Sequence, residues 1–251
     1  MTEYLLFQLY GPLQSWGDVA VGEIRPDVRA PTKSAVLGLL AAALGVRRDE
    51  EERHARMANA YGLAVRHDVK GIPLRDFHTV QSASARKGRV YRCRADLLGG
   101  MLETGEGLNT IVTYRDYTAD ACFSVCIWTR EDVPPYALSE LAEALRQPRF
   151  TPYLGRKSCP LGLPFSPQLT EAESVGVAFA SYPVDGRVAK GLSMDSKGTV
   201  EMSWDADGDA GVAEDRVESI RDAPLSRRRW QFTVRDKSVG TTDCPLRREW
   251  E

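Results

Sequence analysis

The sequence predicts an α+β fold, and two observations lead to that prediction. Segments with strand-like and helical patterns follow one another in the order β-α-β and then β-β-α-β, which is the order of a ferredoxin-like domain. Between the central strands, residues 81–109 interrupt this order with small residues, glycines and arginines. We therefore expect one α+β domain from which a long excursion leaves between two central strands.

In the first half of the chain, residues 4–10 form an uncharged run of β-formers that predicts a strand. Gly11 and Pro12 end it, because proline has no amide hydrogen for the strand ladder. Thr32 is a predicted N-cap for a buried helix that Gly45 closes. The remaining predictions in this half are a polar helix over 50–61 and strands over 61–66 and 74–80.

In the second half, residues 111–128 read as a hairpin of two strands joined near residues 118–120. An amphipathic helix is expected over 135–146, followed by a loop over 149–165 that is rich in glycine and proline. Residues 201–222 hold eight acids against two arginines, which predicts a solvated, mobile loop. Residues 227–240 then return as a basic strand.

Composition excludes several function classes. The 251 residues carry a net charge of −2, so any nucleic acid must be met by a local basic patch. Five cysteines without CxxC spacing indicate a reduced, cytoplasmic protein, and no apolar run is long enough to span a membrane. The three histidines have no metal-ligand spacing, and a Walker loop is absent, so we expect neither a metal nor a cofactor.

Two basic segments are candidates for binding RNA. The segment TPYLGRKSCP places Gly155, which allows close approach of backbone amides, beside the charges of Arg156 and Lys157, a combination that suits an anion. The other segment lies in the excursion, where cations with an interposed tyrosine suit backbone neutralisation and base stacking: Arg86, Lys87, Arg89, Tyr91, Arg92 and Arg94. A solvated loop is the alternative for this second segment.

The stretch YGPLQSWG follows the first strand and could be a phosphate cradle, a base platform or a tight turn. It lacks the lysine and glycine spacing of a phosphate loop. We expect Trp16 to pack in the core, which leaves Gln14 and Ser15 to face RNA or a neighbouring subunit.

With these residues assembled, the sequence resembles the CasD family of the type I-E CRISPR complex Cascade, within the Cas-five superfamily. The matching stretches cover about the first two thirds of the chain in the family's order: YLLFQLYGPLQSWG, RPDVRAPTKSAVLGLLAAALG, LRDFHTV, YRDYTADACFSV and RFTPYLGRKSCPL. The basic excursion and the last third share little with the family.

The resemblance implies a modified ferredoxin-like (RRM-like) palm over residues 1–251, with a β-hairpin thumb at about 81–113 and an acidic loop at about 201–222. It implies a non-catalytic subunit that binds the 5′ handle of CRISPR RNA and caps the backbone filament. The implied partners are the CasC backbone subunit, the large CasA subunit and, through the assembled complex, target DNA.

Position by position, the resemblance assigns Lys33 and Ser34 to the RNA-facing start of the first helix and Arg115 to the base of the thumb. The full set of expected RNA-binding residues is Gln14, Ser15, Arg29, Lys33, Ser34, Arg75, His78, Arg115, Tyr153, Gly155, Arg156, Lys157 and Ser158.

Two other functions stay open. In the related I-C subtype the corresponding subunit is an endoribonuclease, and His78 is the candidate general acid or base for such metal-independent chemistry. The other reading of His78 is a local hydrogen bond or a partner contact. A purely protein-binding scaffold is the third function considered.

Overall fold

A computed structural model describes residues 1–82, 88, 90–96, 109–192 and 199–243. Seven strands form the larger of its two sheets, and every neighbouring pair is antiparallel. In spatial order the strands are β10 (Glu214–Ser226), β11 (Gln231–Asp243), β9 (Thr199–Asp205), β4 (Tyr61–Val69), β7 (Cys122–Thr129), β1 (Thr2–Tyr10) and β8 (Gln168–Ala172). No helix of the described residues is long and apolar enough to cross a membrane.

The helices confirm the local signals in the sequence. Helix α1 (Lys33–Leu44) begins at Thr32, whose hydroxyl accepts a hydrogen bond from the Ala35 amide, and ends at Gly45 with a φ of 76°. Further helices are α2 (Glu51–Ala60), α4 (Leu138–Arg146), α5 (Val175–Ala180) and α6 (Gly186–Gly191).

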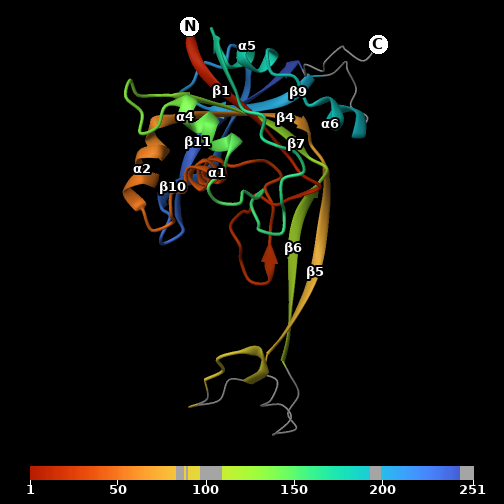
Figure 1. The fold of residues 1–251 in the computed structure, drawn as a ribbon. Helices are drawn as coiled ribbons and strands as arrows, with labels where there is room; N and C mark the ends of the chain where they lie inside the picture. Colours follow the sequence, from red (N-terminus) through yellow and green to blue (C-terminus); the bar gives the residue numbers. More distant parts are fainter. Residues whose placement is uncertain (83–87, 89, 97–108, 193–198, 244–251) are drawn as a thin grey trace.

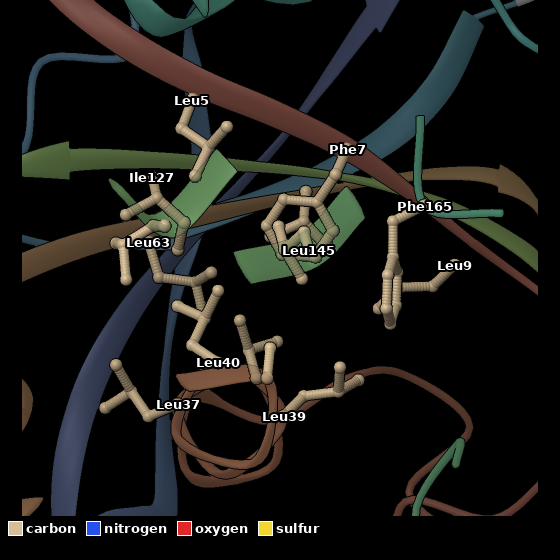
Figure 2. Packing of buried hydrophobic residues seen from close by; sticks show 14 of the residues in the cluster. Leu5, Phe7, Leu9, Leu37, Leu39, Leu40, Leu63, Ile127, Leu145 and Phe165 are labelled. Atoms are coloured by element: carbon tan, nitrogen blue, oxygen red, sulfur yellow. The ribbon is translucent and has the colours of Figure 1, made fainter. Parts of the chain in front are cut away.

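The main hydrophobic core lies between one face of the large sheet and helices α1 and α4. Phe7 and Ile127 point from the sheet toward Leu40 of α1 and Leu145 of α4 (Figure 2). Helix α5 covers the opposite face, where Phe179 packs in a second cluster. Because residues 4–9 of β1 are buried on both faces, they show no alternation of apolar and polar residues, and Gln8 is the one polar side chain among them.

The second sheet is built around a long two-stranded hairpin that extends away from the rest of the molecule (Figure 1). Strands β5 (Ile72–Ser82) and β6 (Asn109–Ala119) pair in continuous antiparallel register. The short strands β2 (Leu13–Gln14) and β3 (Ile24–Arg25) also pair with β6.

The prediction that residues 111–128 form one hairpin was wrong, although both strands exist. Strand β6 pairs with β5, whereas β7 lies between β1 and β4 in the large sheet. Burial explains the separation: β7 is largely buried, as a central strand must be, while β6 is largely exposed or half-buried. Asp120, with a φ of 55°, lies where the chain passes from one sheet to the other.

The expected mobile acidic loop at 201–222 was also wrong. Most of that segment belongs to β9 and β10, and Asp205 and Asp222 are almost fully buried. Their charges are neutralised by cations from distant parts of the chain, which a local count of charges does not reveal.

Candidate nucleic-acid interface

The two loops that carry the sequence motifs, residues 11–17 and 153–160, lie against each other. The Ser15 amide donates to the Leu154 carbonyl over 3.1 Å. Gly155 has a φ of 85°, and a Cβ atom there would come within 1.7 Å of the Ser15 carbonyl oxygen. Only glycine allows this approach, so the glycine of the motif fixes the basic loop onto the end of β2.

The prediction that Gln14 and Ser15 face RNA or a neighbouring subunit was wrong, because both side chains are buried. Gln14 is 0% exposed, donates to the Ala121 carbonyl over 2.6 Å and accepts from the Trp16 indole over 3.1 Å. The buried Ser15 hydroxyl donates to the Asp116 carbonyl. Both side chains therefore join loops together, while Trp16 packs in the core as expected, with its ring edge-on to Phe123.

Lys33 also does not face RNA. Its side chain is buried and its Nζ lies 2.6 Å from Asp205, while its backbone amide donates to Asp222 over 2.6 Å. Burial lowers the pKa of Lys33, and Asp205 opposes that shift. Ser34 is half-buried, and its hydroxyl lies 3.2 Å from that of Thr32.

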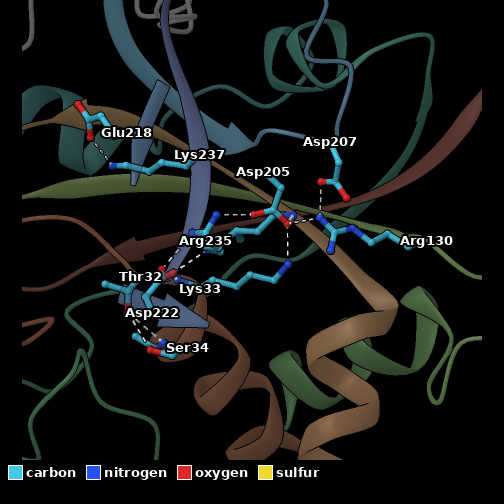
Figure 3. Close-up of polar contacts among 12 residues, drawn as sticks. Thr32, Lys33, Ser34, Arg130, Asp205, Asp207, Glu218, Asp222, Arg235 and Lys237 are labelled. Carbon is cyan, nitrogen blue, oxygen red and sulfur yellow. Dashed lines mark hydrogen bonds and ion pairs between the residues drawn. The ribbon is translucent and has the colours of Figure 1, made fainter. Parts of the chain in front are cut away.

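Asp205 is the centre of an ion cluster that the sequence did not reveal. Lys33, Arg130 and Arg235 contact it at 2.6, 2.7 and 2.7 Å respectively. Figure 3 shows how these side chains converge on it. Arg235 continues the cluster to Asp222 over 2.6 Å. The cluster joins α1 to the C-terminal strands, and its charges bind one another, so they are not available to a ligand.

Around Asp116 the structure does bring predicted cations together. Arg75 binds the Asp116 carboxylate through two nitrogens at 2.6 and 2.9 Å. Arg156 stacks over Tyr117 at 4.9 Å and donates to a backbone carbonyl over 3.1 Å. The pKa of Asp116 is lowered, first by the hydrogen bond from Arg75 and further by the charges of Arg156 and Arg29. Asp116 thus lies within reach of the charges of three arginines, of which Arg75 is its direct partner.

The other predicted residues lie near this cluster or farther along the hairpin. Tyr153, Lys157 and Ser158 are exposed on the basic loop. Arg115 is half-buried on β6, opposite Asp76 of β5. His78 Nε2 lies 2.6 Å from the same aspartate, a contact that fits both a local ion pair and an imidazole oriented by a carboxylate.

Part of the basic excursion lies within the described residues. Arg94 donates to the Gln81 carbonyl over 2.6 Å, and the Arg92 amide donates to Asp96 over 3.1 Å. Tyr91 is half-buried. Arg86, Lys87 and Arg89 lie outside the described residues.

An open groove of about 1320 Å³ begins at the basic loop. Gly155 and Arg156 line one end of it, beside residues 16–20. It runs along α1, where Ser34 and Gly38 line it, to the turn between β10 and β11. Within the described part of the chain, no group of three His, Cys, Asp or Glu side chains is placed to hold a metal ion.

Comparison with known proteins identifies the family. A model of the CRISPR-associated protein family Cas5 matches residues 4–237. The chain belongs to the Cas5 family. Among curated Cas5 relatives, the Cascade subunit CasD of Escherichia coli strain K12 is 38% identical over 200 residues, which cover 75% of this chain and 81% of that protein. This confirms the resemblance to the CasD family seen in the sequence.

Solved structures support the same family and the α+β architecture. A chain of a CRISPR RNA-guided surveillance complex matches with a TM-score of 0.64 and 26% identity, covering 96% of this chain and 91% of that one. A crystal structure of a Cas protein matches with a TM-score of 0.57 and 26% identity, covering 96% and 99%. The Cas5 fold therefore extends through the C-terminal third, where the sequence resemblance could not be traced.

Proposed function

We propose that this Cas5 chain is a non-catalytic subunit of a Cascade-type surveillance complex that binds the 5′ handle of CRISPR RNA. The observation that carries the proposal is the loop of Gly155, Arg156 and Lys157, held against β2 at the mouth of the groove. The names of the CasD relative and of the surveillance complex support it.

The charge arrangement explains how a chain of net charge −2 could bind RNA. Arg75 binds Asp116, the charges of Arg29 and Arg156 act on the same carboxylate, and Lys157 is exposed on the loop that carries Arg156. Arginine binds phosphate oxygens through two parallel hydrogen bonds, and exposed aromatic rings such as Tyr153 can stack on unpaired bases. Phosphates would position the handle here, and pockets for individual bases would supply specificity.

The fold suggests how the rest of the chain would serve the complex. The strand order β4-β7-β1-β8, with α1 and α4 on one face, supports an RRM-like palm. The β5–β6 hairpin would be the thumb, which packs against the adjacent CasC subunit. We further propose that the chain caps the filament and helps seat CasA, that it meets target DNA through the assembled complex, and that it is cytoplasmic.

The proposal is tested by measuring how the purified full chain binds a labelled RNA of the handle over a range of salt concentrations. In the double variant Arg156→Ala, Lys157→Ala we expect affinity to fall at least about tenfold. We expect the salt slope to fall by roughly 0.7 for each phosphate that the variant no longer neutralises. Arg56→Ala, an exposed arginine on α2 away from the groove, is the matched control. A purely protein-binding scaffold predicts no change in the double variant.

The alternative function is a metal-independent endoribonuclease that processes precursor CRISPR RNA. The observation in its favour is the 2.6 Å contact of His78 with Asp76, since a carboxylate can orient a catalytic imidazole. Incubating the chain with labelled repeat RNA in EDTA separates the two functions. Specific cleavage that disappears in His78→Ala would establish the nuclease, and intact RNA supports the non-catalytic subunit.

A further inference from the structure

A buried arginine without a counterion lies at the far end of the groove. Arg227 begins the turn between β10 and β11 and is 8% exposed. Its Nη2 donates to the Ser34 carbonyl, its Nε has no partner in the described structure, and no carboxylate of the described residues pairs with it. Burial, followed by the like charge of Arg48, lowers the pKa of Arg227 to about 10. At neutral pH the guanidinium is still charged, so an uncompensated positive charge is held at the groove wall.

A second arginine and a tryptophan complete the cluster. Arg48 donates to the Arg227 carbonyl over 2.9 Å, and its guanidinium lies 4.5 Å from the centre of the Trp230 ring. The Arg227 guanidinium lies 6.0 Å from the same ring. Trp230 is 59% exposed as a residue, although Arg48 lies over its ring and Phe232 lies edge-on to it at 5.6 Å. The exposed part of the indole is available to a ligand.

The turn that carries this cluster is fixed in place. Its backbone is held on α2, because the Arg228 amide donates to Glu51 over 3.2 Å and the Ser226 hydroxyl donates to the same carboxylate. The turn lies beside α2 (Figure 1). Trp230 has a φ of 57°, a conformation that a large side chain rarely adopts without a structural or functional reason.

We propose that Arg48, Arg227 and Trp230 form a nucleotide subsite that takes one phosphate on the two arginines and stacks the adjoining base on the tryptophan. The inference rests on the proposed function, because the groove that holds this cluster begins at Gly155 and Arg156. It extends the RNA path along α1 into the C-terminal third of the chain.

The chemistry of the cluster favours a single-stranded nucleic acid over an acidic peptide. Both ligands supply an anion for the arginines, but a peptide carboxylate brings no flat surface for the exposed indole. Proteins bind unpaired nucleotides in grooves where cations alternate with aromatic rings, because every base has a face that can stack on such a ring. Tyr153, at the other end of the groove, repeats this arrangement beside Arg156.

The test measures binding of a fluorescein-labelled single-stranded RNA of roughly twelve nucleotides, a length in the range that such grooves hold. We expect Trp230→Ala to weaken binding by roughly five- to hundred-fold and Trp230→Phe to retain most of the affinity. Because phenylalanine has the same backbone preferences, this pair separates stacking from a change in the turn. Arg48→Ala should weaken binding and lower the salt slope by roughly 0.7, while Arg56→Ala should change neither.

The outcomes distinguish this inference from the proposed function. If Arg156→Ala, Lys157→Ala weakens RNA binding while Trp230→Ala and Arg48→Ala bind as wild type, the subsite is wrong and the proposed function stands. If all of these variants bind as wild type, both fail. If Trp230→Ala and Arg48→Ala lose only the binding of an acidic peptide such as oligoglutamate, the groove end is a protein site and the inference is overturned.

Discussion

Lys33 Nζ lies 2.6 Å from Asp205 Oδ2, and both side chains are almost completely buried. The pair joins the first turn of α1 to the end of β9 across 172 residues of sequence. It places the cation expected to contact RNA inside the protein, where it neutralises an aspartate that was expected in a mobile loop. The pair therefore corrects both expectations.

Replacing Lys33 should affect stability but not RNA binding. In Lys33→Met, Asp205 keeps Arg130 and Arg235 but loses its buried partner, so we expect the free energy of unfolding in urea to fall by about 1–3 kcal/mol. RNA affinity should stay within about twofold. Lys157→Met is a control for which the opposite pair of effects is expected. Because Lys157 is exposed, its replacement should leave stability unchanged and reduce RNA affinity. An RNA defect in Lys33→Met at full stability would contradict the structural role.

Local signals in the sequence predicted several elements of the fold but not the partners of its polar side chains. Helix α1 was predicted from Thr32 to Gly45 because its cap and its terminating glycine act within one turn of the residues they satisfy. Gln14 was misassigned because its partner, the Ala121 carbonyl, is 107 residues away and is brought close only by the pairing of β2 with β6.

The same limit applies to the candidate site. Arg156 and Lys157 could be found because the charges and the glycine lie together in one loop. Arg48, Arg227 and Trp230 meet only after β10 and β11 fold against α2, so the sequence, in which Arg227 only begins a basic segment, did not connect it with Arg48. The observation that reveals this cluster is the buried Arg227 guanidinium without a counterion. Burial and missing partners can be seen only in a structure.

Gly155→Ala should both destabilise the protein and weaken RNA binding. The new methyl group would meet the Ser15 carbonyl at 1.7 Å, and the φ of 85° is unfavourable for alanine, so the basic loop must move. We expect a loss of roughly 2–3 kcal/mol in the free energy of unfolding. Gly17→Ala is the matched control, since the φ of Gly17 is 74° but no atom would lie within 4 Å of the added Cβ. For this variant we expect a loss of about 1 kcal/mol in the free energy of unfolding. Equal effects in the two variants would show that the contact with Ser15 does not matter.

His67 should make the protein less stable in acid. This buried ring of β4 lies edge-on to Phe123, and its pKa is lowered to about 4, mainly by burial. Glu201, at 3.7 Å, raises the pKa, whereas Lys70 and Lys237 lower it further. Because the unfolded histidine titrates near 6.5, the unfolded state binds more protons between pH 6.5 and 4, and stability falls as the pH drops through that window.

The contribution of His67 can be measured by urea unfolding at a series of pH values. At pH 4 the loss in the free energy of unfolding due to His67 is about 3 kcal/mol at most. Because glutamine cannot titrate, His67→Gln should reduce the change of the unfolding free energy with pH between pH 6.5 and 4. His54→Gln on α2 is the comparison, and a smaller change is expected because that ring is only half-buried. If the free energy of unfolding of His67→Gln depends on pH as in the wild type, the buried ring does not cause the loss of stability in acid.

The outer part of the β5–β6 hairpin should be required for assembly and not for folding. Val80 and Ile111 are paired across the two strands, and each is 48% exposed although apolar. An exposed apolar pair on a projecting hairpin is typical of a surface that a partner covers, here the proposed CasC contact. We expect Val80→Asp, Ile111→Asp to abolish co-purification with the backbone subunit while the melting temperature changes by less than about 3 °C. Val217→Asp, at a similarly exposed apolar position of β10 in the large sheet, should assemble normally. Normal assembly of the hairpin variant would rule out this surface as the thumb contact.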